Sequence, residues 1–582
     1  MRRWAVGGKR EEGRGKREAV GGKHRTWLRS SRFPLPASPL LFLLLVTCRN
    51  SEAPGDGTNP PPPPAQEVSV LTQHNDNSRT GLNDNETALT TANVNAQHFG
   101  MVFTVAVDDQ VYAQPLVVGH VMIDGAVHNV VIVATVNNTV YAFDGDSGTL
   151  YWQKNFTAPG LRPPRRLDMT GACSGAYTDF SGNIGIVGTP VIDGATGTIY
   201  FVARSTTGTL FVQHLHAVNI ADGSDVIGSP MEITASYPGN GDGSVNGMLA
   251  FDAQRQNQRQ GLTLLNGTVY VTFSSHCDWG PYHGWILGYD ASTLQQKIVY
   301  NDTPNGSAGG LWESGAGMAA DAEGNLYVVA GNGTVGDSAA GDPTSLTNRG
   351  ESALKLTPTG STLRVASYFT PSDFQYLNDN DLDYGGTGAL LIPNTNLYVT
   401  GGKDGNIYVL NKDDMGGYQP SSNRVQQVVR IGTNNVNMHC QTTYYKGNSR
   451  EFVYVWSEND PLRAIPFDRA SNLLSPQSEI VSSAPGPTGQ SGAILSVSSN
   501  GSEAGTGILW SSYAASGDAE HDVSPGILRA FDASDVTKEL WNNRQNSGDA
   551  AGSYAKFAAP TIATGHVYLP TFSNRVVAYG LR

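Results

Sequence analysis

Short runs of β-branched and aromatic residues, separated by polar turns, recur along the chain from residue 110 to its end. One unit, Val130–Trp152, contains apolar runs of strand length, an Asn-Asn turn and an Asp-x-Ser-Gly turn. These runs do not show the 3.6-residue period of an amphipathic helix. The pattern therefore predicts a repeated antiparallel unit of short strands.

Seven further runs resemble one strand of this unit. They are Thr198–Ala203, Thr268–Phe273, Asn325–Ala330, Asn396–Gly401, Glu451–Trp456, Gly507–Ser512 and His566–Thr571. With the first unit they give eight repeats at a spacing of roughly sixty residues. Such repeats are typical of a β-propeller, in which each blade is a small antiparallel sheet. We therefore predict an all-β, eight-bladed β-propeller of four-stranded blades over residues 68–582.

The last unit is one strand short. When the strands of a blade are lettered a to d from the axis outward, the final run, Val576–Gly580, is strand c. The segment Gly100–Ala106 lies before the first strand a, and we expect it to supply the missing strand d. That pairing would join the two ends of the chain in one blade and cover an exposed sheet edge.

The N-terminal region divides into a leader and a tether. Residues 1–48 are basic at first and then apolar over residues 40–47, a run too short to span a bilayer and typical of a secretory signal. Residues 45–48 resemble a lipobox, in which Cys48 would be lipidated and become the mature N-terminus. The alternative is simple cleavage of the leader without a lipid. Residues 49–67 are proline-rich and predict an extended tether. We therefore expect an extracytoplasmic protein that contacts a membrane only through a lipid anchor.

The charge of the chain argues against nucleic acid as a partner. The formal net charge is −13, and the first 48 residues hold 11 Lys and Arg against 3 Glu. The remainder therefore carries about −21, and such a surface repels phosphate backbones. We expect a monomer that binds no nucleic acid.

Long loops gather on one face of the predicted ring. Loops from strand b to c, and from d to the next a, open on the same face of a propeller, whereas the a–b and c–d turns open on the other and are short. The long polar loops on the first face are residues 161–188, 276–283, 332–349, 370–384, 434–441 and 512–524. We predict that this looped face is the working surface, for a protein, peptide or glycan partner.

The repeats resemble those of a known family. Tyr141–Trp152 and Leu528–Trp541 are similar to the pyrroloquinoline quinone (PQQ) repeat, the blade unit of quinoprotein alcohol dehydrogenases. The resemblance covers nearly the whole chain from Val68 and includes His74–Gly81, which is similar to segments that precede such propellers. It implies the fold, but many proteins with these repeats bind no quinone, so the fold alone does not decide the chemistry.

The resemblance also implies a set of site residues. Asp278 and Asn332 would be Ca²⁺ ligands, Asp383 the catalytic base, and Lys403 a contact to the quinone. Oxygen ligands suit a hard cation, and a carboxylate can remove the proton of a substrate hydroxyl. Three tryptophans are candidates for an aromatic platform beside the cofactor: Trp279, Trp285 and Trp312.

The chain departs from the family pattern in ways that leave a second function open. It lacks the family's adjacent Cys-Cys pair, and without a Cys-x-x-Cys-His haem motif it would need an external electron acceptor. Asp and Asn also stabilise tight turns, so the four carried-over positions have an alternative role in loop structure. From the sequence alone we favour a non-catalytic binding module, and the alternative is a PQQ- and calcium-dependent dehydrogenase of alcohols or sugars.

Three cysteines follow Cys48, an odd number for an oxidising compartment. Cys173 and Cys277 lie in loops of the same predicted face, so we expect them to form a disulfide and Cys440 to be free or buried. An alternative is a zinc or copper site, which would need nitrogen and sulfur ligands to converge. Its candidate ligands are His276, Cys277, His283, His439 and Cys440.

Overall fold

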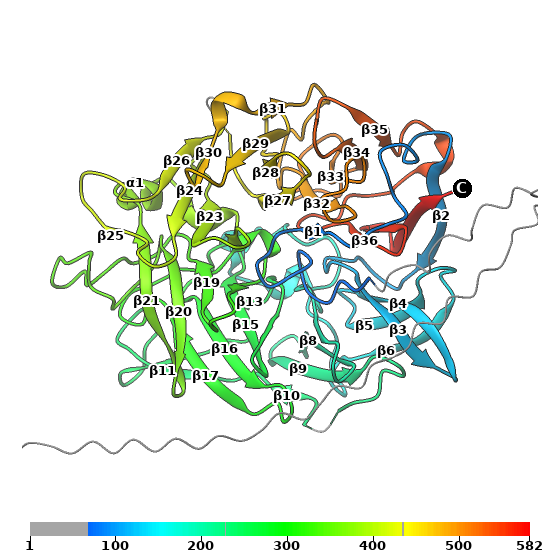
Figure 1. Ribbon diagram of the computed structural model, residues 1–582. Helices are drawn as coiled ribbons and strands as arrows, with labels where there is room; N and C mark the ends of the chain where they lie inside the picture. Colours follow the sequence, from blue (N-terminus) through cyan, green and yellow to red (C-terminus); the bar gives the residue numbers. More distant parts are fainter. Residues whose placement is uncertain (1–67, 227, 433–435) are drawn as a thin grey trace, which may run out of the picture. The chain divides into compact units, whose positions relative to one another are not determined.

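The computed structural model describes residues 68–226, 228–432 and 436–582. In this part of the chain, eight small antiparallel sheets form a ring, which confirms the predicted eight-bladed β-propeller (Figure 1). The described residues include a single short α-helix, α1 (Phe374–Asp379), and no helix among them is long and apolar enough to cross a membrane. The predicted leader (residues 1–48) and tether (residues 49–67) lie outside the described residues.

The first four blades follow the order of the chain from the inner to the outer strand. Their strands are β3 (Leu116–Ile123), β4 (Ala126–Ala134), β5 (Thr139–Asp144) and β6 (Leu150–Asn155); β7 (Val191–Asp193), β8 (Thr198–Thr206), β9 (Phe211–Asn219) and β10 (Met231–Glu232); β14 (Thr263–Leu265), β15 (Thr268–Ser275), β16 (Trp285–Asp290) and β17 (Gln296–Asn301); and β18 (Ala319–Ala320), β19 (Leu326–Val329), β20 (Ala353–Thr359) and β21 (Thr362–Thr370).

The other blades follow the same plan. Their strands are β22 (Leu390–Leu391), β23 (Leu397–Gly401), β24 (Asn406–Asn411) and β26 (Gln427–Arg430); β27 (Thr443–Lys446), β28 (Glu451–Val455), β29 (Arg463–Asp468), β30 (Leu473–Leu474) and β31 (Ile480–Val481); β32 (Ile494–Ser498), β33 (Ile508–Ala514), β34 (Gly526–Asp532) and β35 (Glu539–Asn542); and β36 (Thr561–Ala563), β37 (His566–Pro570), β38 (Arg575–Leu581) and β2 (Phe99–Ala106). The short strands β1 (Leu82–Asn83), β13 (Gln256–Asn257) and β25 (Gly417–Tyr418) add to these sheets, and β11 (Ser236–Pro238) pairs with β12 (Met248–Ala250).

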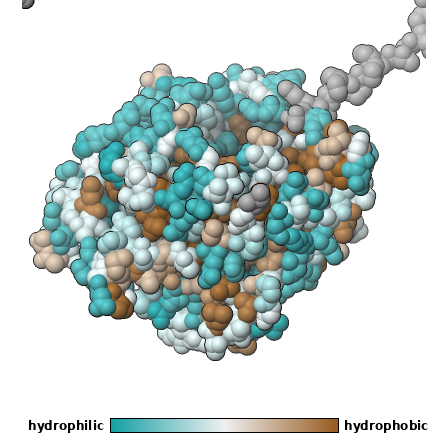
Figure 2. All heavy atoms as spheres, turned by 90° about the horizontal axis from the view of Figure 1, so that it is seen from below, coloured by the Kyte–Doolittle hydropathy of each residue, from teal (hydrophilic) through white to brown (hydrophobic). Residues whose placement is uncertain are grey.

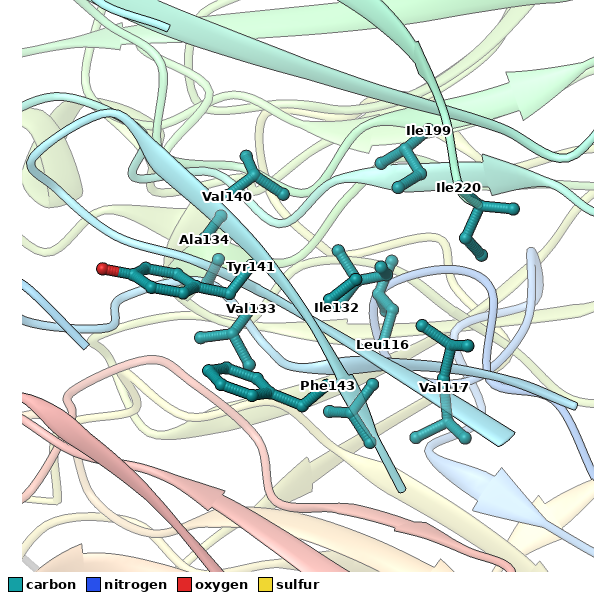
Figure 3. Close-up of a cluster of buried hydrophobic side chains, with 14 of the residues drawn as sticks. Leu116, Val117, Ile132, Val133, Ala134, Val140, Tyr141, Phe143, Ile199 and Ile220 are labelled. Carbon is teal, nitrogen blue, oxygen red and sulfur yellow. The ribbon is translucent and has the colours of Figure 1, made fainter. Parts of the chain in front are cut away.

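The hydrophobic core lies between neighbouring blades. Leu116 and Ile132 of the first blade share a buried cluster with Ile199 of the second (Figure 3). Because each central strand is covered by a blade on both faces, every residue of β8 is buried, including the polar Arg204, Ser205 and Thr206 at its end. Burying each such aliphatic side chain contributes about 1.5–3 kcal/mol. On the outside, hydrophilic residues are interspersed with hydrophobic ones (Figure 2).

The last blade contains a strand from the beginning of the described chain. β2 pairs antiparallel with β38, with Gly100 opposite Gly580 and Val105 opposite Val576. The strand order in this sheet is β2-β38-β37-β36. The segment Gly100–Ala106 therefore takes the outer position of the final blade and hydrogen-bonds along the edge of strand c.

Residues 70–81 run along the inside of the ring, where Figure 1 shows them beside the inner strands. Their backbone hydrogen-bonds to the first strand of six blades. The pairs are Val70 with Val117, Leu71 with Ile192, Asn77 with Ala320, Ser78 with Leu391, Thr80 with Tyr444, and Gly81 with Val497. The buried Arg79 side chain adds hydrogen bonds to the Gln73 and Met318 carbonyl oxygens. This segment therefore ties the inner strands of separate blades together.

Candidate functional site

A cavity of about 240 Å³ is lined by residues from all eight connections between successive blades. These connections, and the b–c loops that add to them, are the loops predicted to open on one face. The cavity therefore lies on the looped face, around the axis of the ring. We describe its lining as two walls. The carboxylate wall consists of Asp278, Asp381, Asp383 and Lys403, and the donor wall of Tyr112, Tyr177, Arg259 and Lys556.

Asp278 follows β15 and points into the cavity, where its carboxylate accepts a hydrogen bond from the Tyr282 hydroxyl. The residue is exposed to the cavity, yet the surrounding protein atoms displace bulk water. This desolvation, together with the nearby Asp383 carboxylate, raises the pKa of Asp278 to about 6. Two carboxylates therefore lie close enough to repel each other.

Lys403 compensates the charge of this wall. Its Nζ lies 2.7 Å from Asp383 Oδ2 and 3.2 Å from Asp381 Oδ1. Burial alone would lower the pKa of Lys403, but the two carboxylates outweigh it and raise the pKa above its ordinary value. The predicted base and the predicted quinone contact are thus joined in one ion pair.

Asn332 lies beside the cavity and supports Asp383. Its backbone N–H donates to Asp383 Oδ1 at 2.7 Å, and its side-chain amide donates to Asp381 Oδ1 at 2.7 Å. The Asn332 Oδ1 atom is buried and has no hydrogen-bond partner among the described residues. The side chain also lines a neighbouring groove with Gly333 and Asn378. Asn332 therefore offers an unused amide oxygen next to the carboxylate wall.

The three candidate tryptophans occupy different places. Trp312 lines the cavity. Trp279 packs under the Arg255 guanidinium, whose central carbon lies 5.3 Å from the ring centroid. Trp285 is the first residue of β16 and is fully buried in the core, edge to face with Phe251. Of the three predicted platforms, Trp312 is therefore the one positioned to contact a ligand, and Trp285 serves the blade core.

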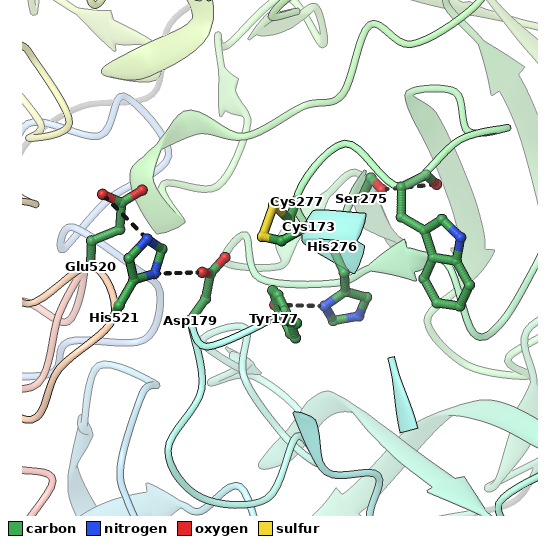
Figure 4. Close-up of a disulfide and its surroundings, with 9 residues drawn as sticks. Cys173, Tyr177, Asp179, Ser275, His276, Cys277, Glu520 and His521 are labelled. Carbon is green, nitrogen blue, oxygen red and sulfur yellow. Dashed lines mark hydrogen bonds and ion pairs between the residues drawn. A yellow bond between two sulfur atoms is a disulfide. The ribbon is translucent and has the colours of Figure 1, made fainter. Parts of the chain in front are cut away.

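The predicted disulfide is confirmed, and Cys440 is free and buried (Figure 4). The Cys173–Cys277 bond has a Cα–Cα distance of 5.3 Å and lines the cavity. The alternative zinc or copper site is wrong, because Cys277 is engaged in the disulfide. Its histidines have other partners: His276 contacts Tyr177, His283 contacts Thr303, and His439 contacts Glu458. In the described part of the chain, no three His, Cys, Asp or Glu side chains are grouped to hold a metal ion.

Strained backbone surrounds the cavity. Pairs of consecutive non-glycine residues have positive φ: Cys173 and Ser174, Cys277 and Asp278, and Glu313 and Ser314. Such conformations cost energy and gather at functional sites. Close packing adds to this, since a Cβ on Gly331 would lie 2.4 Å from Asp383 Oδ1 and 2.8 Å from Trp312 Cδ1. Only glycine at position 331 lets the carboxylate and the indole approach in this way.

The donor wall contains residues that sequence reasoning missed. Tyr177 lies in a loop that was singled out for its length, but Arg259 and Lys556 lie outside every such loop. The Arg259 guanidinium stacks between two rings, with its central carbon 5.6 Å from the Trp312 centroid and 4.4 Å from that of Phe557. Lys556 is buried, which lowers its pKa to about 8. The cavity is thus lined by aromatic and cationic side chains as well as by carboxylates.

Comparison with known proteins bears on the fold. No protein-family model matches the sequence, and a search of the curated proteins found no match. Among solved structures, quinohemoprotein alcohol dehydrogenase ADHIIG from Pseudomonas putida HK5 has a TM-score of 0.53 at 13% identity, over 88% of this chain and 80% of that chain.

Two other dehydrogenases are similar to the same extent. The quinohemoprotein alcohol dehydrogenase from Comamonas testosteroni has a TM-score of 0.53 at 13% identity, over 88% of this chain and 80% of that chain. A europium-containing methanol dehydrogenase has a TM-score of 0.54 at 11% identity, over 88% of this chain and 98% of that chain. The chain therefore has a quinoprotein-like propeller fold, as the repeats predict, and at this identity the likeness concerns the fold alone.

Proposed function

We propose that the cavity binds a quinone cofactor of the PQQ class with a hard cation, and that the protein is a dehydrogenase of alcohols or sugars. One observation supports this most. Asp278, Trp312, Asp383 and Lys403 come from separate loops and line the same cavity. Four of the residues that the resemblance implies for a quinone site therefore lie around one cavity.

The residues beside the carboxylate wall fit such a cation. Asp278 offers carboxylate oxygens, and the buried Oδ1 of Asn332 lacks a partner in the described chain. A cation held by these oxygens would relieve the repulsion that raises the pKa of Asp278. Trp312 offers a flat aromatic surface to the ring of a cofactor.

The role of Asp383 in this proposal follows from its two contacts. Lys403 holds one carboxylate oxygen and the Asn332 N–H holds the other, so the carboxylate has a fixed orientation. From that position it would accept the proton of a substrate hydroxyl, for which geometry matters before pKa. A quinone held in the cavity would supply two-electron oxidation, and a cation held by Asp278 and Asn332 would supply Lewis-acid chemistry. The cavity walls would exclude bulk water from the reacting groups.

The proposed location is outside the cytoplasm. A disulfide persists in oxidising compartments and is rare in the cytosol. The Cys173–Cys277 bond supports this location, together with the leader expected over residues 1–48 and its tether over residues 49–67.

The test combines binding with turnover. We expect calorimetric titration of the purified protein to show that PQQ binds in the presence of Ca²⁺, and we expect the loaded protein to reduce a dye with primary alcohols or sugars. Asp383→Asn should reduce turnover by at least a hundredfold, since general-base catalysis contributes about 10²–10⁴-fold. Asp222→Asn is the matched control, because Asp222 is exposed in a turn after β9. Absence of PQQ binding, or equal turnover in the two variants, would contradict the proposal.

The binding module favoured from the sequence alone remains a second proposal. It rests on the long loops of the looped face, which would bind a protein, peptide or glycan without chemistry. It makes a different prediction in the dye-reduction assay. A protein, peptide or glycan binds the looped face, but no dye is reduced with any alcohol or sugar.

A further inference from the structure

We infer that the donor wall is a subsite for a carboxylate group of an aromatic organic ligand. Tyr112, Tyr177, Arg259 and Lys556 form it, and all four line the cavity. The inference rests on the proposed function to the extent that both require the cavity to be the ligand site. It adds a position and a chemical class of ligand that the carboxylate wall does not provide.

The direction of one hydrogen bond leaves the Tyr177 proton unused. Arg204 lies 3.1 Å from His276 Nε2, and a guanidinium can only donate, so this nitrogen accepts. Burial lowers the pKa of His276 well below its ordinary value, so the ring is neutral and carries its hydrogen on Nδ1. That N–H donates to the Tyr177 oxygen at 2.9 Å. The Tyr177 O–H must therefore donate elsewhere, and the residue lines the cavity.

Other donors around the cavity also lack acceptors. The Tyr112 hydroxyl, Arg259 Nε and Trp312 Nε1 are buried and have no hydrogen-bond partner in the described chain. Leaving a buried polar group unpaired costs free energy, so such groups are rare in native proteins. Several at one cavity are better explained by a ligand rich in acceptor oxygens than by separate defects.

Two of the wall's members carry positive charge without an ion pair. Among the described residues, no carboxylate forms a salt bridge with Arg259 or Lys556, although Lys556 donates to the Glu520 carbonyl oxygen and Arg259 to that of Trp312. Buried cations are normally paired. In contrast, Lys403 across the cavity has two carboxylate partners. An anionic ligand would supply the direct ion pair that nearby carboxylates such as Asp179 do not form with these cations.

One carboxylate on this side already has a partner. Asp179 lines the cavity, and its Oδ1 lies 3.0 Å from His521 Nδ1 (Figure 4). Glu520 also lines the cavity, and its carboxylate lies 3.8 Å from His521 Nε2. The case for an anionic ligand therefore rests on the unpaired donors and cations, and not on an excess of positive charge.

The rings of the wall define the rest of the ligand. Tyr112 packs on Phe180, and the Arg259 guanidinium stacks on Phe557 and Trp312. These flat surfaces suit an aromatic body, and planar donors such as guanidinium match the two oxygens of a carboxylate. Such a carboxylate could belong to the quinone cofactor itself or to an acidic aromatic substrate.

The experiment uses benzene-1,3-dicarboxylate as the probe and its uncharged diamide as the comparison. We expect the full protein, in buffer freed of divalent cations on a chelating resin, to bind the dicarboxylate in calorimetry and to bind the diamide at least tenfold more weakly. Lys556→Met and Tyr177→Phe should each weaken dicarboxylate binding roughly 10–100-fold, as expected for hydrogen bonds to a charged group. Lys538→Met is the control, since Lys538 is exposed in a turn beside Asp535. Near-ultraviolet circular dichroism verifies that each variant is folded.

The outcomes separate this inference from the proposed function. Equal binding by wild type and both folded variants, no binding at all, or equal affinity for the diamide would overturn the carboxylate subsite. Sensitivity of dicarboxylate binding to both variants, without PQQ binding or dye reduction, would support the subsite and refute the dehydrogenase. If PQQ with Ca²⁺ displaces the dicarboxylate, the subsite accepts a cofactor carboxylate. If both bind together, it accepts an acidic substrate.

Discussion

The two walls of the cavity differ in whether their positive charges form ion pairs. On the carboxylate wall, Lys403 lies within 3.2 Å of both Asp381 and Asp383. On the donor wall, Arg259 and Lys556 form no ion pair with any described carboxylate, and the Tyr112 hydroxyl has no partner there. The first arrangement stabilises the protein without a ligand, whereas the second costs stability until a ligand arrives. The difference suggests which wall is built for folding and which for binding.

Breaking the link between the walls should have the largest effect. The Cys173–Cys277 disulfide joins the loop that carries Tyr177 to the loop that carries Asp278, over a sequence separation of 104 residues. Replacing both cysteines by serine should lower the free energy of unfolding by about 4–5 kcal/mol, because the unfolded chain gains freedom. Denaturant titration measures this, with Cys440→Ser as the thiol control. A double variant as stable as wild type would show that the loops are held by other contacts.

Removing the paired lysine should have the next largest effect. Lys403→Met leaves Asp383 buried without its counter-charge, and unpairing a buried ion pair costs about 3 kcal/mol or more. Asp381 is exposed and should contribute little to this loss. The measurement is again the unfolding free energy at pH 7, compared with Lys538→Met on the surface. Unchanged stability would remove the contrast between the walls.

Removing the unpaired lysine, Lys556, should raise the free energy of unfolding instead of lowering it. Lys556→Met removes a desolvated cation and keeps an apolar chain of similar length, so stability at pH 7 should rise by about 1–2 kcal/mol. The folded pKa of about 8 lies below the unfolded value of 10.5, so the wild type recovers stability as pH rises from 8 to 10.5. The advantage of the variant should therefore shrink over that range. Destabilisation at pH 7 would mean that Lys556 has a structural role.

The smallest effect concerns pH and the donor wall. Burial, opposed by Asp179, Glu520 and Asp518 and assisted by Arg259, lowers the pKa of Lys556 to about 8. Affinity for a carboxylate probe should therefore fall as pH rises above about 8, by at most about tenfold per pH unit. Calorimetry between pH 7 and 9.5 tests this, and Lys556→Met should show a flat profile. A wild-type profile that is also flat would contradict the contribution of this ammonium group.

The sequence predicts the fold and the carboxylate wall better than the donor wall, for a physical reason. Every blade repeats the same strand and turn signals, and Asp278, Asp383 and Lys403 each lie in a local motif. Arg259 and Lys556 belong to no motif, and they meet only because the ring brings distant loops to one axis. Trp285 illustrates the limit in another way. It stands close to Asp278 in sequence, but β16 begins at that residue and takes its ring into the core.

The pairing of β2 with β38 determines when their blade can fold during synthesis of the chain. A ribosome makes residues 99–106 more than 400 residues before their partner strand, residues 575–581. Until then β2 has no sheet to join, and its row of backbone donors and acceptors is open to other chains. This blade can therefore assemble only after residues 575–581 have been made and, for an exported protein, carried across the membrane. A nascent chain stalled before residue 575 could form up to seven blades, but β2 would remain unpaired. Chaperones or proteases could then bind this exposed strand.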